Sequence, residues 1–474
     1  MSFCKNLDLI LFDSLTNSKR KVNLIKENHL KFYVCGPTIY ERPHLGNARS
    51  IVIYDLFYRF FRVKFDNVTY VRNITDVDDK INQCAKERNI SIKSLTSEIL
   101  VFFNQDIEKL NVLTPNFQPK ATDHIDEMIK IIQILIDKGH AYISKGHVLF
   151  NVKTYKEYGK LSNRDISELN AGARIEVANY KKDPLDFVLW KPSDDGDDES
   201  SIFNSPWGNG RPGWHIECSA MSTKYLGNNF DIHGGGADLQ FPHHENEIAQ
   251  SKCAYQDSHY ANYWVHNGFL TVNGEKMSKS LKNFITVNDL VGKKYSGLVI
   301  RLLLLSTHYR KPLDFNDKSL EDAIKTINKF CQSSKQEFMM DQKQIEDIFK
   351  NIDDKNPDHK YLVQTMKYLA DDFNISKIMA MLHEMCKESK KNSNISKQLT
   401  HILQFLGFID KSSFGSEDKI EEIDKDFIVS KINERLDAKK NKNYQLADKI
   451  RQELLDKGVI LEDVANNKTN YSLK

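Results

Sequence analysis

Residues 31–47, KFYVCGPTIYERPHLGN, decide the fold. The apolar run Lys31–Val34 predicts a buried strand, and from Ser50 to Arg62 apolar residues recur at helical spacing. A second apolar run, Asn67–Val71, predicts another buried strand. Strand, glycine-bearing turn, helix and strand, in that order, are typical of the opening of a nucleotide-binding α/β fold.

A similar unit follows later in the chain. Phe230–Ile232 predicts a strand, Gly234–Gly236 a turn, and His243–Ala254 a helix. Tyr263–Val265 predicts a further strand, which leads toward Lys276–Ser280. The two units together predict one α/β domain that is built from separate parts of the chain.

The residues between the two units follow another pattern. His140–Val152 alternates around Lys145 and Gly146 like a β-hairpin, and the acidic stretch Ser193–Ser200 indicates an exposed loop. We interpret about 120–205 as an insertion in the fold.

The chain becomes helical toward its end. Ser319–Leu406 has helical spacing without strand alternation, the charged stretch Lys411–Lys425 indicates a linker, and Ile428–Asp463 predicts a small helical module. The expected parts are a catalytic domain of residues 1–119 and 206–318, an insertion of residues 120–205, a helical domain of residues 319–410, a linker of residues 411–427 and a C-terminal module of residues 428–474.

Composition bounds the cellular setting. The 474 residues carry a formal net charge of +2, which neither supports nor excludes a nucleic-acid partner. Met1–Asn17 lacks the features of a secretory signal, and the most apolar stretch, Leu298–Leu305, is too short to span a bilayer. Seven widely scattered cysteines are no disulfide framework, so we expect a protein of the reducing cytoplasm.

Two short motifs point to phosphate chemistry. Pro43–Asn47 stands where the first helix begins, and free backbone N–H groups at a helix N-terminus suit phosphate. There His44 can donate to phosphate oxygens, while Gly46 lets a flat ring approach the backbone. Alone, such a string more often serves capping and turn chemistry.

In Lys276–Ser280, two lysines can follow a triphosphate as charge moves onto pyrophosphate. A solvated basic loop is the common alternative, which the presence of both motifs weakens.

Four residues are candidate metal ligands. His243 and Glu247 lie four apart on a predicted helix and share one face, Cys35 ends the first strand, and Cys218 lies between the two units. Two thiols, an imidazole and a carboxylate would suit tetrahedral zinc. Spacing alone does not select them, because lone cysteines are mostly core residues and His–Glu pairs are more often surface pairs.

Several strings together resemble the cysteinyl-tRNA synthetases, which are class I aminoacyl-tRNA synthetases. The resemblance runs from about Tyr33 to Asp463 with the motifs in the family's order. The strings that carry it are Phe32–Tyr40, Arg72–Lys80, Gly213–Met221, Phe230–Ala249 and Lys276–Ser280.

The resemblance implies a Rossmann-type catalytic domain and assigns its phosphate-binding motifs. Residues 44–47 match the family's His-Ile-Gly-His signature, and Lys276–Ser280 match its lysine loop. Here Leu45 replaces isoleucine and preserves the packing, whereas Asn47 replaces the second histidine and carries no charge. The catalytic residues are then His44, Asn47, Lys276 and Lys279, and the ATP contacts are His44, Gly46 and Lys279.

The resemblance also assigns the zinc and cysteine sites. One zinc ion per chain would be bound by Cys35, Cys218, His243 and Glu247. Cysteine would be contacted by Gly36, Thr75, Trp214 and His233, with Trp214 as a wall of the pocket. We expect His244 and Glu245 to point to another helix face and Glu217 to be structural.

Zinc fits the substrate that the resemblance implies. Zinc lowers the pKa of a thiol and binds the thiolate, whereas the hydroxyl of serine is harder and less acidic. A pocket that only packs a similar side chain discriminates about 10–200-fold. Direct ligation would therefore explain why the sequence has no apparent editing domain, a point against which the insertion at Lys120–Ser205 must be checked.

The implied reaction has two steps. Cysteine attacks the α-phosphate of ATP, with magnesium on the triphosphate, and cysteinyl-adenylate and pyrophosphate form. A terminal ribose hydroxyl of tRNA(Cys), expected to be the 2′-hydroxyl, then attacks the adenylate. The family expectation for the oligomeric state is a monomer, with no membrane partner.

The helical domain and the terminal module resemble the family's anticodon-binding parts. Tyr444, Asp448 and Arg451 lie at i, i+4 and i+7, so they share one helical face. An aromatic ring for stacking, a carboxylate acceptor and an arginine donor would form a base-reading set. The alternative is an ordinary amphipathic helix in which Tyr444 packs inward.

Two other functions compete with this reading. A related enzyme would ligate activated cysteine to an amino sugar, but such enzymes lack the anticodon-binding end that Ile428–Asp463 resembles. A non-catalytic RNA- or zinc-binding descendant is disfavoured by the presence of His44, Lys276, Lys279 and all four proposed ligands.

Overall fold

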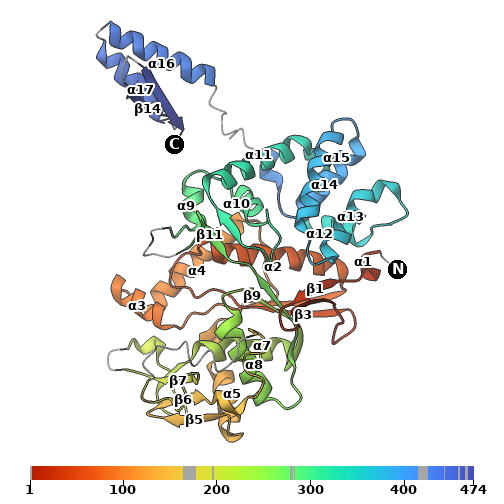
Figure 1. The fold of residues 1–474 in the computed structure, drawn as a ribbon, viewed down its shortest axis with the longest axis vertical. Helices are drawn as coiled ribbons and strands as arrows, with labels where there is room; N and C mark the ends of the chain where they lie inside the picture. Colours follow the sequence, from red (N-terminus) through yellow and green to blue (C-terminus); the bar gives the residue numbers. More distant parts are fainter. Residues whose placement is uncertain are drawn as a thin grey trace. The chain divides into compact units, whose positions relative to one another are not determined.

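The computed structural model describes most of the chain and divides it into two compact units, Met1–Asp410 and Lys411–Lys474 (Figure 1). The described residues are 3–163, 178–194, 197–277, 281, 283–414, 425–441, 443–456, 459–464 and 468–473. Among these residues, none of the helices combines the length and the apolar character needed to cross a membrane.

A parallel four-stranded sheet is the centre of the first unit. Its strands are β3 (His29–Val34), β4 (Asn67–Arg72), β9 (Asn229–Gly236) and β10 (Tyr260–Asn267), in the order β10-β9-β3-β4. Helix α2 (Leu45–Lys64) covers one face, while α7 (Trp214–Leu226) and α8 (Glu245–Ala254) cover the other (Figure 1). The predicted strands, the first helix and the α/β class are confirmed.

The strand order places a topological switch point between β3 and β9. These strands are neighbours, but the chain leaves β3 toward β4 and leaves β9 toward β10, on opposite sides. In open parallel sheets, ligands bind outside the carboxyl ends of the strands at such a switch point. Cys35, which directly follows β3, stands at this place.

The predicted turn at Gly234–Gly236 is wrong, because these glycines continue strand β9. They pair with Val265, His266 and Asn267 of β10. Neighbouring side chains leave no room for a Cβ atom here: on Gly234 it would lie 2.5 Å from the ring of Tyr54, and on Gly235 it would lie 2.7 Å from the ring of His244. The backbone N–H of Gly235 donates to the Tyr54 hydroxyl at 2.6 Å, so helix α2 packs directly on the strand backbone.

An antiparallel sheet follows α5 in the chain. The predicted hairpin around Lys145 and Gly146 is confirmed, and both residues adopt the positive φ angles of a tight turn. The elements from α3 to the end of this sheet are α3 (Asp79–Arg88), α4 (Ile92–Lys109), α5 (Ile125–Asp137), β5 (Ala141–Ser144), β6 (His147–Phe150), β7 (Phe187–Pro192) and β8 (Gly210–Pro212), with sheet order β5-β6-β7-β8.

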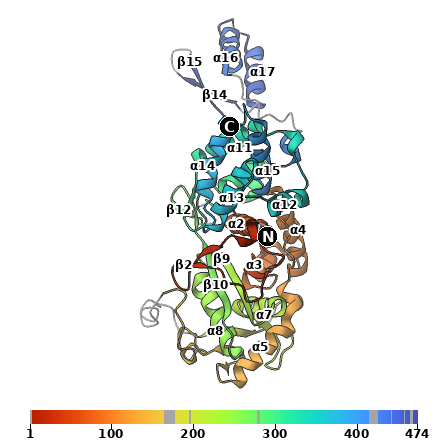
Figure 2. The same ribbon diagram turned by 90° about the vertical axis from the view of Figure 1, so that its right-hand side faces the viewer.

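The rest of the first unit is mainly helical. Both views place α5 and the helices α11–α15 at opposite ends of the unit, with the parallel sheet between them (Figure 2). The remaining elements are α1 (Phe3–Asn6), β1 (Ile10–Asp13), β2 (Ser18–Lys21), β11 (Leu270–Val272), β12 (Glu275–Lys276), α9 (Val287–Gly292), α10 (Gly297–Leu304), β13 (Leu313–Phe315), α11 (Asp317–Ser333), α12 (Gln342–Lys350), α13 (Lys360–Ala370), α14 (Ile375–Glu388) and α15 (Ser393–Phe405).

The sequence pattern predicted a purely helical second unit, and this prediction is wrong. Helices α16 (Lys425–Lys440) and α17 (Tyr444–Asp456) are followed by the antiparallel strands β14 (Val459–Val464) and β15 (Lys468–Leu473). Leu461 of β14 is buried with Ile432, Ile450 and Leu454 in the small core of this unit. Most of the predicted linker, residues 415–424, lies outside the described residues.

Candidate active site and metal centre

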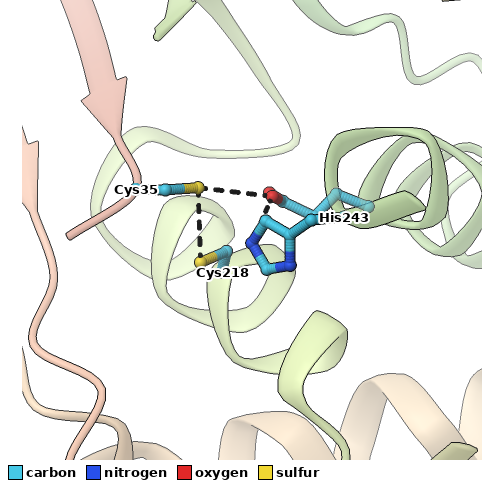
Figure 3. Close-up of side chains that lie close together, drawn as sticks. Cys35, Cys218 and His243 are labelled. Carbon is cyan, nitrogen blue, oxygen red and sulfur yellow. Dashed lines mark hydrogen bonds and ion pairs between the residues drawn. The ribbon is translucent and has the colours of Figure 1, made fainter. Parts of the chain in front are cut away.

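Four side chains from distant parts of the chain meet near this switch point. The Cys35 Sγ atom lies 3.6 Å from Cys218 Sγ and 3.4 Å from Glu247 Oε1, and His243 Nε2 lies 3.1 Å from the same Glu247 oxygen. Figure 3 shows Cys35, Cys218 and His243 turned toward one another. The ligand atoms of all four residues lie within 4.8 Å of one another, so the site is compact enough to hold a metal ion.

The fold delivers these side chains from three elements. Cys35 follows β3, and Cys218 lies on α7. His243 lies in the turn Gln240–His244, which leads into α8, and Glu247 lies in the first turn of α8. The Trp214 ring at the start of α7 stacks on His243 with centroids 4.3 Å apart and is 39% exposed, so it stands between the ligand set and solvent.

The electrostatics of the site favour a bound cation. Burial raises the pKa of Cys218, but the hydrogen bond from Cys35 and the proximity of His243 bring it down to about 6. Although burial opposes charge on Glu247, His233 and His243 hold the pKa of its carboxyl well below the usual range. Cys218 and Glu247 are therefore the anionic groups of the metal-free site and face a protonated His243; a metal ion would take the place of that proton.

Glu247 is fixed by partners outside the ligand set. His233 Nε2 lies 2.9 Å from Glu247 Oε2, and the Tyr260 hydroxyl donates to the same oxygen at 2.7 Å. His215 Nδ1 lies 3.0 Å from His243 Nδ1. Such contacts orient ligand side chains and are typical of metal sites.

The prediction that His244 points to another face is wrong. Its Nε2 atom lies 3.3 Å from Cys35 Sγ and 4.0 Å from Glu247 Oε1, because residues three apart on a helix also lie on neighbouring positions of one face. Cys35, His233, His244 and Glu247 form a second compact group that shares two members with the first. Glu245 does point elsewhere and accepts hydrogen bonds from Ser162.

Two of the residues expected to contact cysteine, Gly36 and Thr75, are joined through Asn73 by hydrogen bonds. The Gly36 N–H donates to Asn73 Oδ1 at 2.8 Å, and a Cβ atom on Gly36 would lie 1.7 Å from the Asn73 carbonyl oxygen, so only glycine fits. Asn73 Nδ2 donates to Thr75 Oγ1 at 3.2 Å, and Thr75 Oγ1 donates to Glu217 at 3.0 Å. The sequence analysis missed Asn73, although it lies two residues before Thr75 in the string Arg72–Lys80.

The structure brings the two phosphate motifs together. The Leu45 N–H donates to the Ile285 carbonyl, the His44 ring lies 5.0 Å from that of Phe284, and a Cβ atom on Gly46 would lie 3.2 Å from the Met277 side chain. Asn47 lies in the first turn of α2, and Lys276 is exposed on β12. Lys279 lies outside the described residues.

His44 caps helix α2. Its Nδ1 atom accepts from the Asn47 N–H at 3.2 Å, and burial lowers its pKa. A neutral imidazole that accepts at Nδ1 carries its proton on Nε2, so His44 can donate to an anion from that atom.

Tyr444, Asp448 and Arg451 all lie exposed on one side of α17, and Tyr444 is 63% exposed. The alternative in which Tyr444 packs inward is therefore wrong. The inward face is formed by Ala447, Ile450 and Leu454 instead.

Comparison with known proteins identifies the class that this fold and site define. The family model described as "tRNA synthetases class I (C) catalytic domain" matches residues 21–325. A cysteine–tRNA ligase of Rickettsia felis is 49% identical over 471 residues, covering 97% of this chain and 98% of the relative. That of Wolbachia pipientis is 46% identical over 471 residues, covering 97% of both chains. The chain belongs to the cysteine–tRNA ligase family of class I tRNA synthetases.

Solved structures agree on the fold. A methionyl-tRNA synthetase of Mycobacterium tuberculosis has a TM-score of 0.52 at 15% identity, covering 80% of this chain and 90% of that chain. The LeuRS of an Agrobacterium radiobacter ternary complex has a TM-score of 0.56 at 10% identity, covering 81% and 84%.

Proposed function

We propose that this chain joins L-cysteine to tRNA(Cys) at the expense of ATP. The cysteine carboxylate attacks the α-phosphate of ATP and releases pyrophosphate. A terminal ribose hydroxyl of the tRNA, the 2′-hydroxyl in our proposal, then attacks the cysteinyl-adenylate and releases AMP. The observation that carries the proposal is the meeting of two thiols, an imidazole and a carboxylate at the end of strand β3, in a chain whose relatives are named cysteine–tRNA ligases.

The donor set suits one zinc ion per chain, held by Cys35, Cys218, His243 and Glu247. When bound, zinc would lower the pKa of the substrate thiol and accept the thiolate, which the hydroxyl of serine does not match. Gly36, Thr75, Trp214 and His233 surround this set and are the proposed contacts for the rest of the amino acid. The Trp214 ring stacked on His243 supports its role as a wall of the pocket.

ATP binding is proposed at the start of α2. The N-terminus of the helix and the Nε2 proton of His44 both favour triphosphate oxygens, and Gly46 keeps the approach open. Lys276 and Lys279 would oppose the charge that develops on pyrophosphate, with magnesium on the triphosphate. Asn47 can add a neutral hydrogen bond.

The second unit is the proposed anticodon reader. Tyr444, Asp448 and Arg451 offer a stacking ring, an acceptor and a donor from one exposed side of α17. We also propose a cytoplasmic monomer; the absence of disulfides among the seven cysteines, all of which are described, supports a reducing compartment.

Two assays test the function. ATP–pyrophosphate exchange should depend on cysteine and should be much weaker with serine, and the enzyme should then charge tRNA(Cys). Exchange without tRNA charging would favour ligation to an amino sugar, and no exchange at all would favour a non-catalytic protein.

A further inference from the structure

Glu217 has a buried carboxyl group, and only one of its two oxygens has a hydrogen-bond partner among the described residues. Its side chain lies on α7, directly before Cys218, and Glu217 is 1% exposed. One oxygen, Oε2, accepts from Thr75 Oγ1 at 3.0 Å. The other, Oε1, is buried without a hydrogen-bond partner among the described residues. A buried acceptor left unpaired is costly, so such a group calls for an explanation.

The other buried glutamates of the neighbouring helix α8 are better satisfied. Glu247 accepts at Oε2 from Tyr260 and faces His243 with Oε1. Glu245 accepts at Oε2 from both the backbone and the hydroxyl of Ser162. Burial beside the sheet therefore does not by itself leave a carboxylate oxygen without a partner.

Glu217 belongs to the cluster that surrounds the proposed metal site. Thr75, its partner, also accepts from Asn73 Nδ2, while Asn73 Oδ1 accepts from Gly36 and lies 3.9 Å from Cys218 Sγ. The segment after β4 thus touches Cys218 through Asn73 and Glu217 through Thr75. The carboxyl group that carries the unpaired oxygen is therefore held, through Oε2, by the same short segment that contacts a proposed zinc ligand.

The chemistry of the proposed substrate supplies the missing partner. Cysteine carries its thiol on Cβ and its ammonium on the adjacent Cα, so both groups must bind close together. An ammonium has three donors and no acceptor, and its hydrogen bonds to carboxylates are among the stronger ones in proteins. We propose that Glu217 Oε1 binds the α-ammonium of the substrate cysteine, with Thr75 holding the carboxylate in place; this inference rests on the proposed function.

The role makes the site selective for an α-amino thiol. A thiol acid without the amine would still offer a thiolate to the metal, but it would leave Glu217 unpaired. Glu217 is therefore a substrate-binding residue, rather than the purely structural one expected from the sequence.

A chemical double-mutant cycle tests this contact on the full-length, zinc-loaded protein. In E217Q, the amide can keep its oxygen on Thr75 and then presents an N–H₂ donor to the ammonium. Calorimetric titration should find L-cysteine binding weakened about 10–100-fold. Binding of 3-mercaptopropionate, which lacks the amine, should be unchanged, and zinc content should remain that of wild type. The matched control E245Q should leave the binding of both ligands unchanged.

Each other outcome decides against the contact. Equal weakening of both ligands, or unchanged cysteine binding, would overturn it. If E217Q is unstable in thermal melts, E217D gives the same comparison, because it keeps the charge and withdraws the oxygens by one methylene group. A wild-type protein that binds neither ligand would overturn the proposed function itself, and the contact with it.

Discussion

Replacing Cys218 with serine should remove the metal and the recognition of cysteine together. The Cys218 thiolate is one of four ligand groups within 4.8 Å of one another. Zinc binding to such four-ligand sites is worth about 10–16 kcal/mol, or about 2.5–4 kcal/mol for each ligand. At about 1.4 kcal/mol per tenfold, the affinity for zinc should fall about 10²–10³-fold. The loss should be this large because the pKa of Cys218, lowered to about 6, already gives a thiolate at neutral pH, whereas serine stays neutral.

The measurement is competition for zinc with a chromophoric chelator, followed by cysteine-dependent pyrophosphate exchange on the same samples. Cys253→Ser is the matched control, because Cys253 is a buried cysteine of α8 that is outside both compact donor groups. The control should keep zinc and activity. If Cys218→Ser keeps the zinc affinity of wild type, or loses zinc but activates cysteine normally, the proposed role of the ligand set is wrong.

Four further predictions concern pH, the lysine loop and the second unit. Burial opposes charge on His243, but Glu247 and Cys218 raise its pKa to about 10, and burial raises the pKa of Cys35 well above its usual range. Zinc must therefore displace about two protons near neutral pH, and the affinity for zinc should fall as the pH is lowered. Calorimetry in buffers of different ionisation enthalpy will count the released protons. Lys279→Ala should slow single-turnover adenylate formation about 10²–10³-fold with little change in cysteine binding; an unchanged rate would make Lys279 a surface lysine. A protein that ends at Asp410 should keep pyrophosphate exchange and lose tRNA charging, because the proposed zinc ligands and phosphate-binding residues all lie in the first unit; loss of both activities would contradict this. A stable Asp448→Ala variant should relax discrimination between cognate and anticodon-altered tRNA by about 1–3 kcal/mol in charging assays, and an unchanged ratio would exclude base reading by Asp448.

Local patterns in the sequence were sufficient to predict much of the fold. The apolar runs at Lys31–Val34 and Asn67–Val71 became β3 and β4, and the alternation around Lys145 became a hairpin. These elements depend on periodicity and turn chemistry that a short window contains. The glycines Gly234–Gly236 misled the same reasoning, because the space around them is taken by side chains from outside the strand, such as Tyr54 at Gly234 and His244 at Gly235.

The site depends on contacts that no short window contains. Cys35 and Cys218 are 183 residues apart and meet only because of the strand order and the placement of α7. Spacing alone therefore left their role open, and family resemblance was needed to group them. The contact of His244 with Cys35 was missed because His244 lies three residues before Glu247, a spacing that also brings two helical side chains together. The unpaired oxygen of Glu217 is visible only when its surroundings are known.

The sulfur coordination of the bound metal tests whether this site reads the thiol of cysteine. X-ray absorption at the zinc edge should find two sulfur ligands in the free enzyme, from Cys35 and Cys218. Addition of L-cysteine should raise the number to three, while serine should leave it at two. An unchanged sulfur count with saturating cysteine would mean that the thiol is recognised elsewhere.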